Sequence, residues 1–70
     1  MAVDFDAASF VVTLADGQTI RVPFSSFRRL LAASPEQRLK VRISSSGKGL
    51  HWDELDEDIS VNGLLRAQRE

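Results

Sequence analysis

The residues best suited to chemistry lie close together, between Gly47 and Leu65. This stretch holds the only histidine, the only tryptophan and half of the ten carboxylates. An imidazole beside carboxylates is compatible with a metal site or with an acid–base pair. The side chains that would build such a site are His51, Asp53, Glu54, Asp56, Glu57 and Asp58. A metal-dependent enzyme centred on this group is therefore one hypothesis for the function.

The same spacing also favours a structural role for the histidine. A lone imidazole has no second imidazole with which to share a metal ion, and the acids do not follow the ligand pattern of a calcium loop. On a strand, His51 and Asp53 would lie on one face. We expect the imidazole to be fixed by a carboxylate or a carbonyl, and we assign no catalytic residue, metal or cofactor.

The other distinctive residues of this stretch have structural interpretations as well. In a phosphate-binding loop the glycines lead directly into a helix. Gly47 and Gly49 are instead followed by an apolar, strand-like segment. Tryptophan is enriched at binding hot spots, yet a core this small more often needs the ring inside. Serines 44–46 have no base at a readable spacing, which argues against a hydrolase. The expected structural residues are Gly47, Gly49, His51, Trp52, Asp58 and Ser60.

Charge is unevenly distributed, although the net charge is only −1. Residues 21–48 carry seven bases against one acid, and residues 49–63 carry five acids and no base. The two segments would pair within one fold or head-to-tail between subunits. The acids 56–58 would either stabilise the N-terminus of a following helix or dock on a basic partner. The candidate interaction surface comprises Arg28, Arg29, Arg38, Arg42, Asp53, Glu54, Asp56 and Glu57.

The basic segment 28–48 supports a second hypothesis, a regulator that binds nucleic acid. Its arginines and lysines would contact phosphates. Solvated helix and strand faces give the same pattern, however, and the segment lacks both interleaved aromatic residues and support from a positive net charge. Nucleic-acid binding therefore has weaker support than protein binding.

The elements that position these groups begin with a β-hairpin. Phe10, Val12 and Leu14 alternate with residues 11, 13 and 15, and the same period of two returns from Ile20 to Phe24. A three-residue loop over residues 15–17 would set Val12 opposite Ile20, whereas a two-residue loop would mix the two faces. We therefore predict the longer loop, with its glycine in the left-handed conformation.

Helical and strand patterns then alternate along the chain. The spacing predicts a helix around residues 26–33, which ends before Pro35 because a residue preceding proline disfavours the helical region. Ser34 to Gln37 has the pattern of a capping box. A strand is predicted around residues 39–44 and a short strand around 49–52, followed by a loop or a single turn over 53–58. Ser60 is placed to cap a short C-terminal helix around residues 60–68.

The predicted fold is thus α+β, a small antiparallel sheet with two helices. Seventy residues suit a single domain, 1–70, with residues 1–7 as a loosely ordered lead-in. A domain of this size buries only about 60% of its unfolded surface, which makes homo-oligomerisation or a partner complex advantageous. The chain has no cysteine, no signal-peptide pattern and no apolar run of membrane-spanning length. We expect a cytoplasmic location and no membrane association.

The segment from Gly47 to Leu65 resembles a bacterial family, domain of unknown function 2442. The shared pattern is G-x-G-[IL]-H-W-x-x-L-D-E-D-I-S-V-x-G-L-L, and the hairpin at residues 12–17 and the turn at residues 34–38 are similar too. The likeness covers most of residues 8–66. This chain departs from the family at Asp53, where proline is common.

The resemblance implies a compact α+β module that stands alone or precedes a helix-turn-helix domain, for which we expect no room after Glu70. Stand-alone members are often encoded beside a small toxin-like protein. The first hypothesis is therefore a non-catalytic protein-interaction module, an antitoxin-like or regulatory partner of a small bacterial protein.

Overall fold

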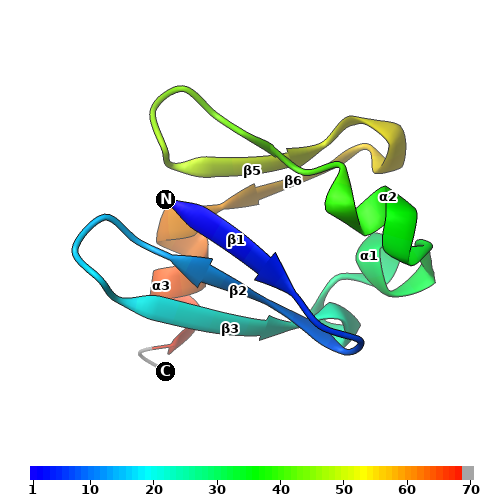
Figure 1. The fold of residues 1–70 in the computed structure, drawn as a ribbon, viewed down its shortest axis with the longest axis horizontal. Coiled ribbons are helices and arrows are strands. Elements are labelled where there is room, and N and C mark those ends of the chain that lie inside the picture. The colour runs from blue at the N-terminus through cyan, green and yellow to red at the C-terminus, as the bar shows by residue number, and fades with distance from the viewer. Residues whose placement is uncertain (69–70) are drawn as a thin grey trace.

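The computed structural model describes residues 1–68, which form two three-stranded antiparallel sheets and three short α-helices (Figure 1). Sheet A has the strand order β1-β2-β3, and sheet B has the order β4-β5-β6. The strands of sheet A are β1 (Ala2–Phe5), β2 (Ser9–Thr13) and β3 (Thr19–Pro23). Those of sheet B are β4 (Arg42–Ile43), β5 (Gly49–Trp52) and β6 (Glu57–Ser60). The fold is α+β, as the sequence predicts.

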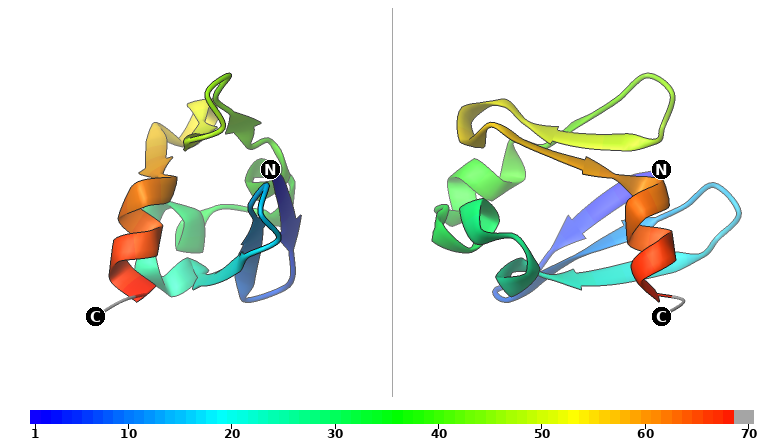
Figure 2. Two further views of the ribbon diagram at one scale, coloured as in Figure 1. Left: turned by 90° about the vertical axis from the view of Figure 1, so that its left-hand side faces the viewer. Right: turned by 180° about the vertical axis from the view of Figure 1, so that it is seen from behind.

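The helices close the space between the two sheets. They are α1 (Arg28–Ala32), α2 (Pro35–Leu39) and α3 (Val61–Gln68), and single 3-10 turns cover Phe24–Ser26 and Asp53–Leu55. Helices α1 and α2 lie at one end of the molecule, whereas α3 runs along the side opposite β1 (Figure 2). The sheets face each other across a shared interior (Figure 1).

The hairpin between β2 and β3 has the predicted register. Val12 lies opposite Ile20, and Phe10 lies opposite Val22. Leu14 N–H donates to the Gln18 carbonyl at 2.8 Å and closes a three-residue loop. Gly17 has a φ of 91°, a conformation that glycine adopts without steric cost.

The predicted caps of α2 and α3 are also present. Ser34 Oγ accepts from Gln37 N–H at 3.2 Å, and the Gln37 side chain accepts from Ser34 N–H at 3.0 Å, which completes the capping box. Ser60 Oγ accepts from Gly63 N–H at 3.3 Å at the start of α3. These local side-chain patterns set where both helices begin.

Four expectations about the elements need correction. Residues 1–7 are not a loose lead-in, because Ala2–Phe5 pair with β2 in full register. The strand expected around 39–44 is only Arg42–Ile43, because α2 continues through Leu39. The single turn allowed for residues 53–58 is present as the 3-10 turn Asp53–Leu55, but Glu57 and Asp58 begin β6 instead of continuing a loop. The expected single sheet is two sheets.

The two strands that were not expected, β1 and β6, share one cause. Pairing with a neighbouring strand decides whether a short polar segment becomes β-structure, so local composition is a weak guide there. β6 begins with two acids, and β1 carries an acid in a four-residue strand. The helix predicted around 26–33 is present, divided between the turn at Phe24–Ser26 and α1.

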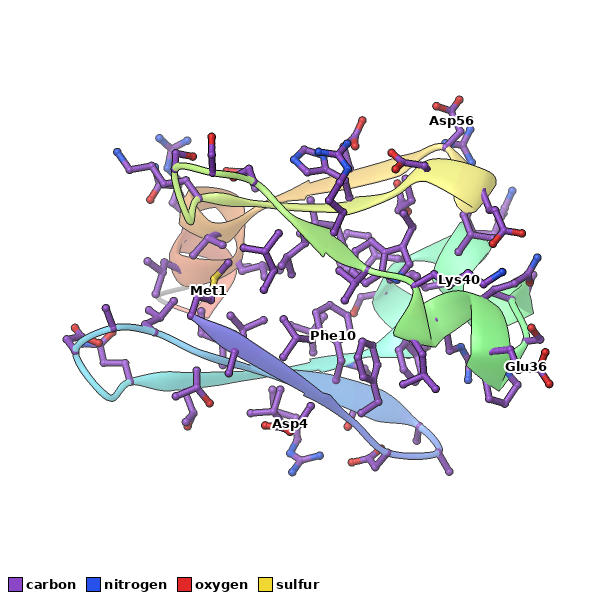
Figure 3. All side chains as sticks on the ribbon, turned by 45° about the horizontal axis from the view of Figure 1, so that its top comes forward. Met1, Asp4, Phe10, Glu36, Lys40 and Asp56 are labelled. Carbon is purple, nitrogen blue, oxygen red and sulfur yellow. The ribbon has the colours of Figure 1, made fainter. Side chains whose placement is uncertain are left out.

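The core lies between the sheets and is aromatic at its centre. Phe10 packs edge-on against Trp52 with ring centroids 5.8 Å apart, and it stacks with Phe24 at the same distance. Figure 3 shows Phe10 pointing between the sheets and Asp4 on the outer side of sheet A. The buried apolar residues around them are Val12, Ile20, Val22, Leu30, Leu50, Ile59 and Leu64.

Within residues 1–68, no helix has both the length and the apolar character needed to cross a membrane.

Candidate functional site

His51 and Asp58 face each other across β5 and β6 on the outer side of sheet B. Imidazole Nδ1 lies 2.6 Å from Asp58 Oδ1, and the His51 side chain is only 25% exposed. A carboxylate therefore holds the imidazole, as expected, but it is Asp58 rather than Asp53. A Cβ added at Gly49 would lie 3.0 Å from His51 Nε2. Glycine at position 49 thus leaves room for the imidazole ring.

Ser44 belongs to the same face, a grouping that the sequence analysis missed. Its Oγ lies 3.4 Å from the point that a Cβ on Gly49 would occupy, beside the imidazole. The Oγ already accepts from the N–H groups of Lys48 at 3.3 Å and Gly49 at 3.0 Å. Its lone pairs therefore hold the β4–β5 turn. The serine, the imidazole and the carboxylate lie near one another without an activated nucleophile.

The basic and acidic segments pair with each other on this side of the molecule. Arg42 donates two hydrogen bonds to the Asp53 carboxylate, at 3.1 and 3.2 Å. Lys40 Nζ lies 2.8 Å from Glu54 Oε2. The guanidinium of Arg42 lowers the pKa of Asp53, and the carboxylate raises the pKa of Arg42 in return. All four side chains are more than half exposed, so water and salt screen these pairs.

Two further arginines of the candidate surface bind backbone carbonyls. Arg29 Nη1 donates to the carbonyl of Asp56, whose φ of 52° turns the chain from the 3-10 turn into β6. Arg38 donates to the carbonyls of Leu30 at 2.8 Å and Leu31 at 3.0 Å. The Leu30 carbonyl also accepts from Ala33 N–H at 3.2 Å, so Arg38 adds a second donor there and supplies one to the Leu31 carbonyl in the last turn of α1. Both arginines hold neighbouring elements together.

The remaining members of the predicted sets divide between surface and interior. Trp52 is 1% exposed, and its Nε1–H donates to the Arg38 carbonyl at 2.9 Å, so it is a core residue. Gly47 has a φ of 71° in the β4–β5 turn. Arg28 is exposed on α1, and Glu57 is half-buried on β6.

A second polar cluster lies on the outer face of sheet A, and the sequence analysis did not identify it. Asp6 Oδ1 accepts from the N–H groups of Ala8 at 2.9 Å and Ser9 at 2.7 Å. Arg21 Nη1 lies 2.7 Å from both Asp6 Oδ2 and Ser9 Oγ. The two backbone bonds and the guanidinium hold the pKa of Asp6 far below its usual range. The signal in the sequence was an Asp three residues before a Ser, a turn pattern.

Three large apolar side chains remain exposed within residues 31–43. Leu31 is 54% exposed, Leu39 is 63% and Ile43 is 39%. A separate cleft of about 250 Å³ lies between β3 and α3, lined by Ile20, Val22, Pro23, Phe27, Leu64 and Ala67 among others. No group of three or more His, Cys, Asp or Glu residues placed to hold a metal ion occurs in the described part of the chain.

Together the fold and these contacts define a class: a small α+β domain whose distinctive polar residues brace two sheets from outside. The chain belongs to the family described as "Protein of unknown function (DUF2442)", whose model matches residues 1–70. This family is the one that the segment from Gly47 to Leu65 resembles.

Two solved structures are similar along almost the whole chain. A protein of unknown function from Rhodospirillum rubrum is 35% identical, with a TM-score of 0.82; the match covers 94% of this chain and 82% of that one. The uncharacterized protein CV0863 from Chromobacterium violaceum is 29% identical, with a TM-score of 0.80. This chain is covered completely but spans 66% of CV0863. No curated protein matches the chain.

Proposed function

We propose that the chain is a non-catalytic protein-interaction module, an antitoxin-like or regulatory partner of a small bacterial protein. One observation carries the proposal: the groups most able to do chemistry are engaged by neighbours in the same chain. Asp58 holds His51, backbone N–H groups engage Ser44 Oγ, and Asp53 pairs with Arg42. Groups held in this way brace the fold, which leaves surface contact as the function.

The exposed apolar residues supply a surface for such contact. Leu39 and Ile43 alternate with Lys40 and Arg42 along the chain, and both bases are paired with acids from the segment after Trp52. Apolar contacts bordered by screened charges are the usual anatomy of a protein interface.

Nucleic-acid binding through the basic segment 28–48 receives less support. Lys40 and Arg42 are paired with carboxylates, and Arg38 is bound to helix carbonyls. A phosphate would have to replace these partners before it gained a contact. The chain's net charge of −1 also gives no general attraction to phosphates.

The test is co-expression with the product of the neighbouring gene, followed by affinity measurement. We expect a complex that Leu39→Asp weakens at least tenfold, which corresponds to about 1.4 kcal/mol. Gln18→Asp is the matched control. Gln18 is exposed beside the β2–β3 loop, and its substitution should leave the affinity unchanged. Absence of a complex, or equal effects of the two variants, would contradict the proposal.

A further inference from the structure

The outer edge of β1 is open and ready to pair. Asp6 N–H donates to the Ser9 carbonyl at 3.0 Å, which fixes the alternation of bonded and non-bonded pairs between β1 and β2. By that alternation Ala2 and Asp4 direct their backbone groups toward β2. Val3 and Phe5 direct their N–H and C=O groups away from the sheet. No hydrogen bond to these groups is present among the residues that the structure describes.

The other three sheet edges are protected in ways that β1 is not. β3 ends in Pro23, which has no N–H, and the cleft beside it is lined by residues of α3. β6 leads directly into α3, and β4 is only two residues long. Proline, short strands and a covering helix are the usual protections of an edge. β1 has four residues and no proline, and it borders the molecule on the side away from α3 (Figure 2).

We propose that β1 pairs antiparallel with β1 of a second copy of this chain, with Val3 opposite Val3 on the two-fold axis. The two three-stranded sheets A would then form one six-stranded sheet. The inward side chains Val3 and Phe5, both half-buried and packed on the core, would be covered further by the partner. A domain of 70 residues gains from such burial because its own core is small.

Charge selects this register over its neighbours. Within β1 only Val3 and Phe5 present free backbone groups. They can pair across a two-fold axis as Val3 with Val3, Val3 with Phe5, or Phe5 with Phe5, which centres the register on residue 3, 4 or 5. Centring on residue 4 sets Asp4 opposite Asp4, and centring on residue 5 sets Asp4 opposite Asp6. Centring on Val3 sets Asp4 opposite Ala2. Like charges directly opposite one another are destabilising, so the Val3 register is favoured.

Charge substitutions at Ala2 test the pairing without disturbing the monomer, because Ala2 is exposed. Ala2→Asp places an acid opposite Asp4 on each side of the axis and should raise the dimer dissociation constant at least tenfold. Ala2→Lys places opposite charges there and should lower it. Sedimentation over about 1 μM to 1 mM, at low salt, measures both. A monomer throughout, or equal behaviour of the two variants, would overturn the proposal.

Disulfide trapping tests the register itself, since the chain has no cysteine of its own. Directly opposite residues in a bonded pair have Cα atoms about 5.5 Å apart, within disulfide range. Val3→Cys should therefore form a covalent dimer on mild oxidation. Asp4→Cys should not, because its symmetry mate lies diagonally. Crosslinking by Asp4→Cys alone would refute the Val3 register. Partner binding through residues 31–43 is measured separately, so either proposal can fail while the other stands.

Discussion

The two sheets bury similar side chains on their inner faces but are braced differently on their outer faces. On sheet A, the Asp6 carboxylate binds two backbone N–H groups and an arginine, so it fixes the chain itself. On sheet B, the carboxylates of Asp53 and Asp58 bind only side chains, those of Arg42 and His51. Exposed side-chain pairs contribute little to stability. Sheet B therefore depends more heavily on the core, and above all on Trp52.

The largest expected effect comes from removing that core contact. Trp52→Ala deletes the ring that packs on Phe10 and should destabilise the domain by about 3–5 kcal/mol, enough to unfold much of the population. Urea denaturation followed by circular dichroism measures the loss. Trp52→Phe keeps an aromatic ring but removes the N–H donor to the Arg38 carbonyl, and it should cost less. Equal losses in the two variants would argue that packing contributes little.

The turns offer a second comparison between the sheets. Gly17 in sheet A and Gly47 in sheet B both have positive φ, and a Cβ at either position would meet no atom within 4 Å. Alanine at either position should therefore cost only the backbone strain, about 1–2 kcal/mol. Asparagine tolerates this conformation better and should recover part of the loss. Thermal denaturation of the alanine and asparagine variants at both positions measures these losses in stability. An unchanged midpoint for Gly17→Ala would show that the loop adopts another conformation.

The smallest effects concern the outer carboxylates and depend on pH. The folded-state pKa of Asp6 is depressed below its unfolded value of about 3.9. Its contribution to stability is therefore present above that pH and is lost as the pH falls toward the folded-state pKa. Asp6→Asn should lower the melting temperature at pH 7, and the difference from wild type should shrink below about pH 4.

Asp53→Asn is the matched variant on sheet B. The pKa of Asp53 is lowered chiefly by Arg42 and by no backbone N–H group, so the change should have the same sign but a smaller size. High salt should diminish the Asp53 effect more than the Asp6 effect, because salt screens exposed charge pairs more than bonds to the backbone. Melting temperatures at low and high salt check this, and equal salt sensitivity would remove the distinction between the sheets.

Features set by neighbours in the sequence could be predicted. The register that places Val12 opposite Ile20 follows from matching the faces of one hairpin, and the capping box from Ser34 to Gln37 is local chemistry. The helix after Ser60 follows from its cap and its apolar spacing. Each of these depends on residues fewer than ten positions apart.

Features set by the meeting of distant strands could not be predicted. The contact between His51 and Asp58 requires the β5–β6 register. The sequence pattern did not indicate β6, because this strand begins with two acidic residues. The bonds from Arg21 to Asp6 and Ser9 require β1, β2 and β3 to be aligned first. Sequence periodicity indicates which residue types lie at such a site, but it does not show which residues contact each other.

Arg38 makes structural contacts that its positive charge alone does not reveal. Its guanidinium lies 4.0 Å over the ring of Phe24, while its carbonyl receives the indole N–H of Trp52. Lysine would keep the charge yet lose the planar fork that reaches two helix carbonyls. A library selected solely for foldedness would therefore retain arginine at position 38 and exchange Arg28 freely. Such selection would separate two residues of identical type by what each does for the chain.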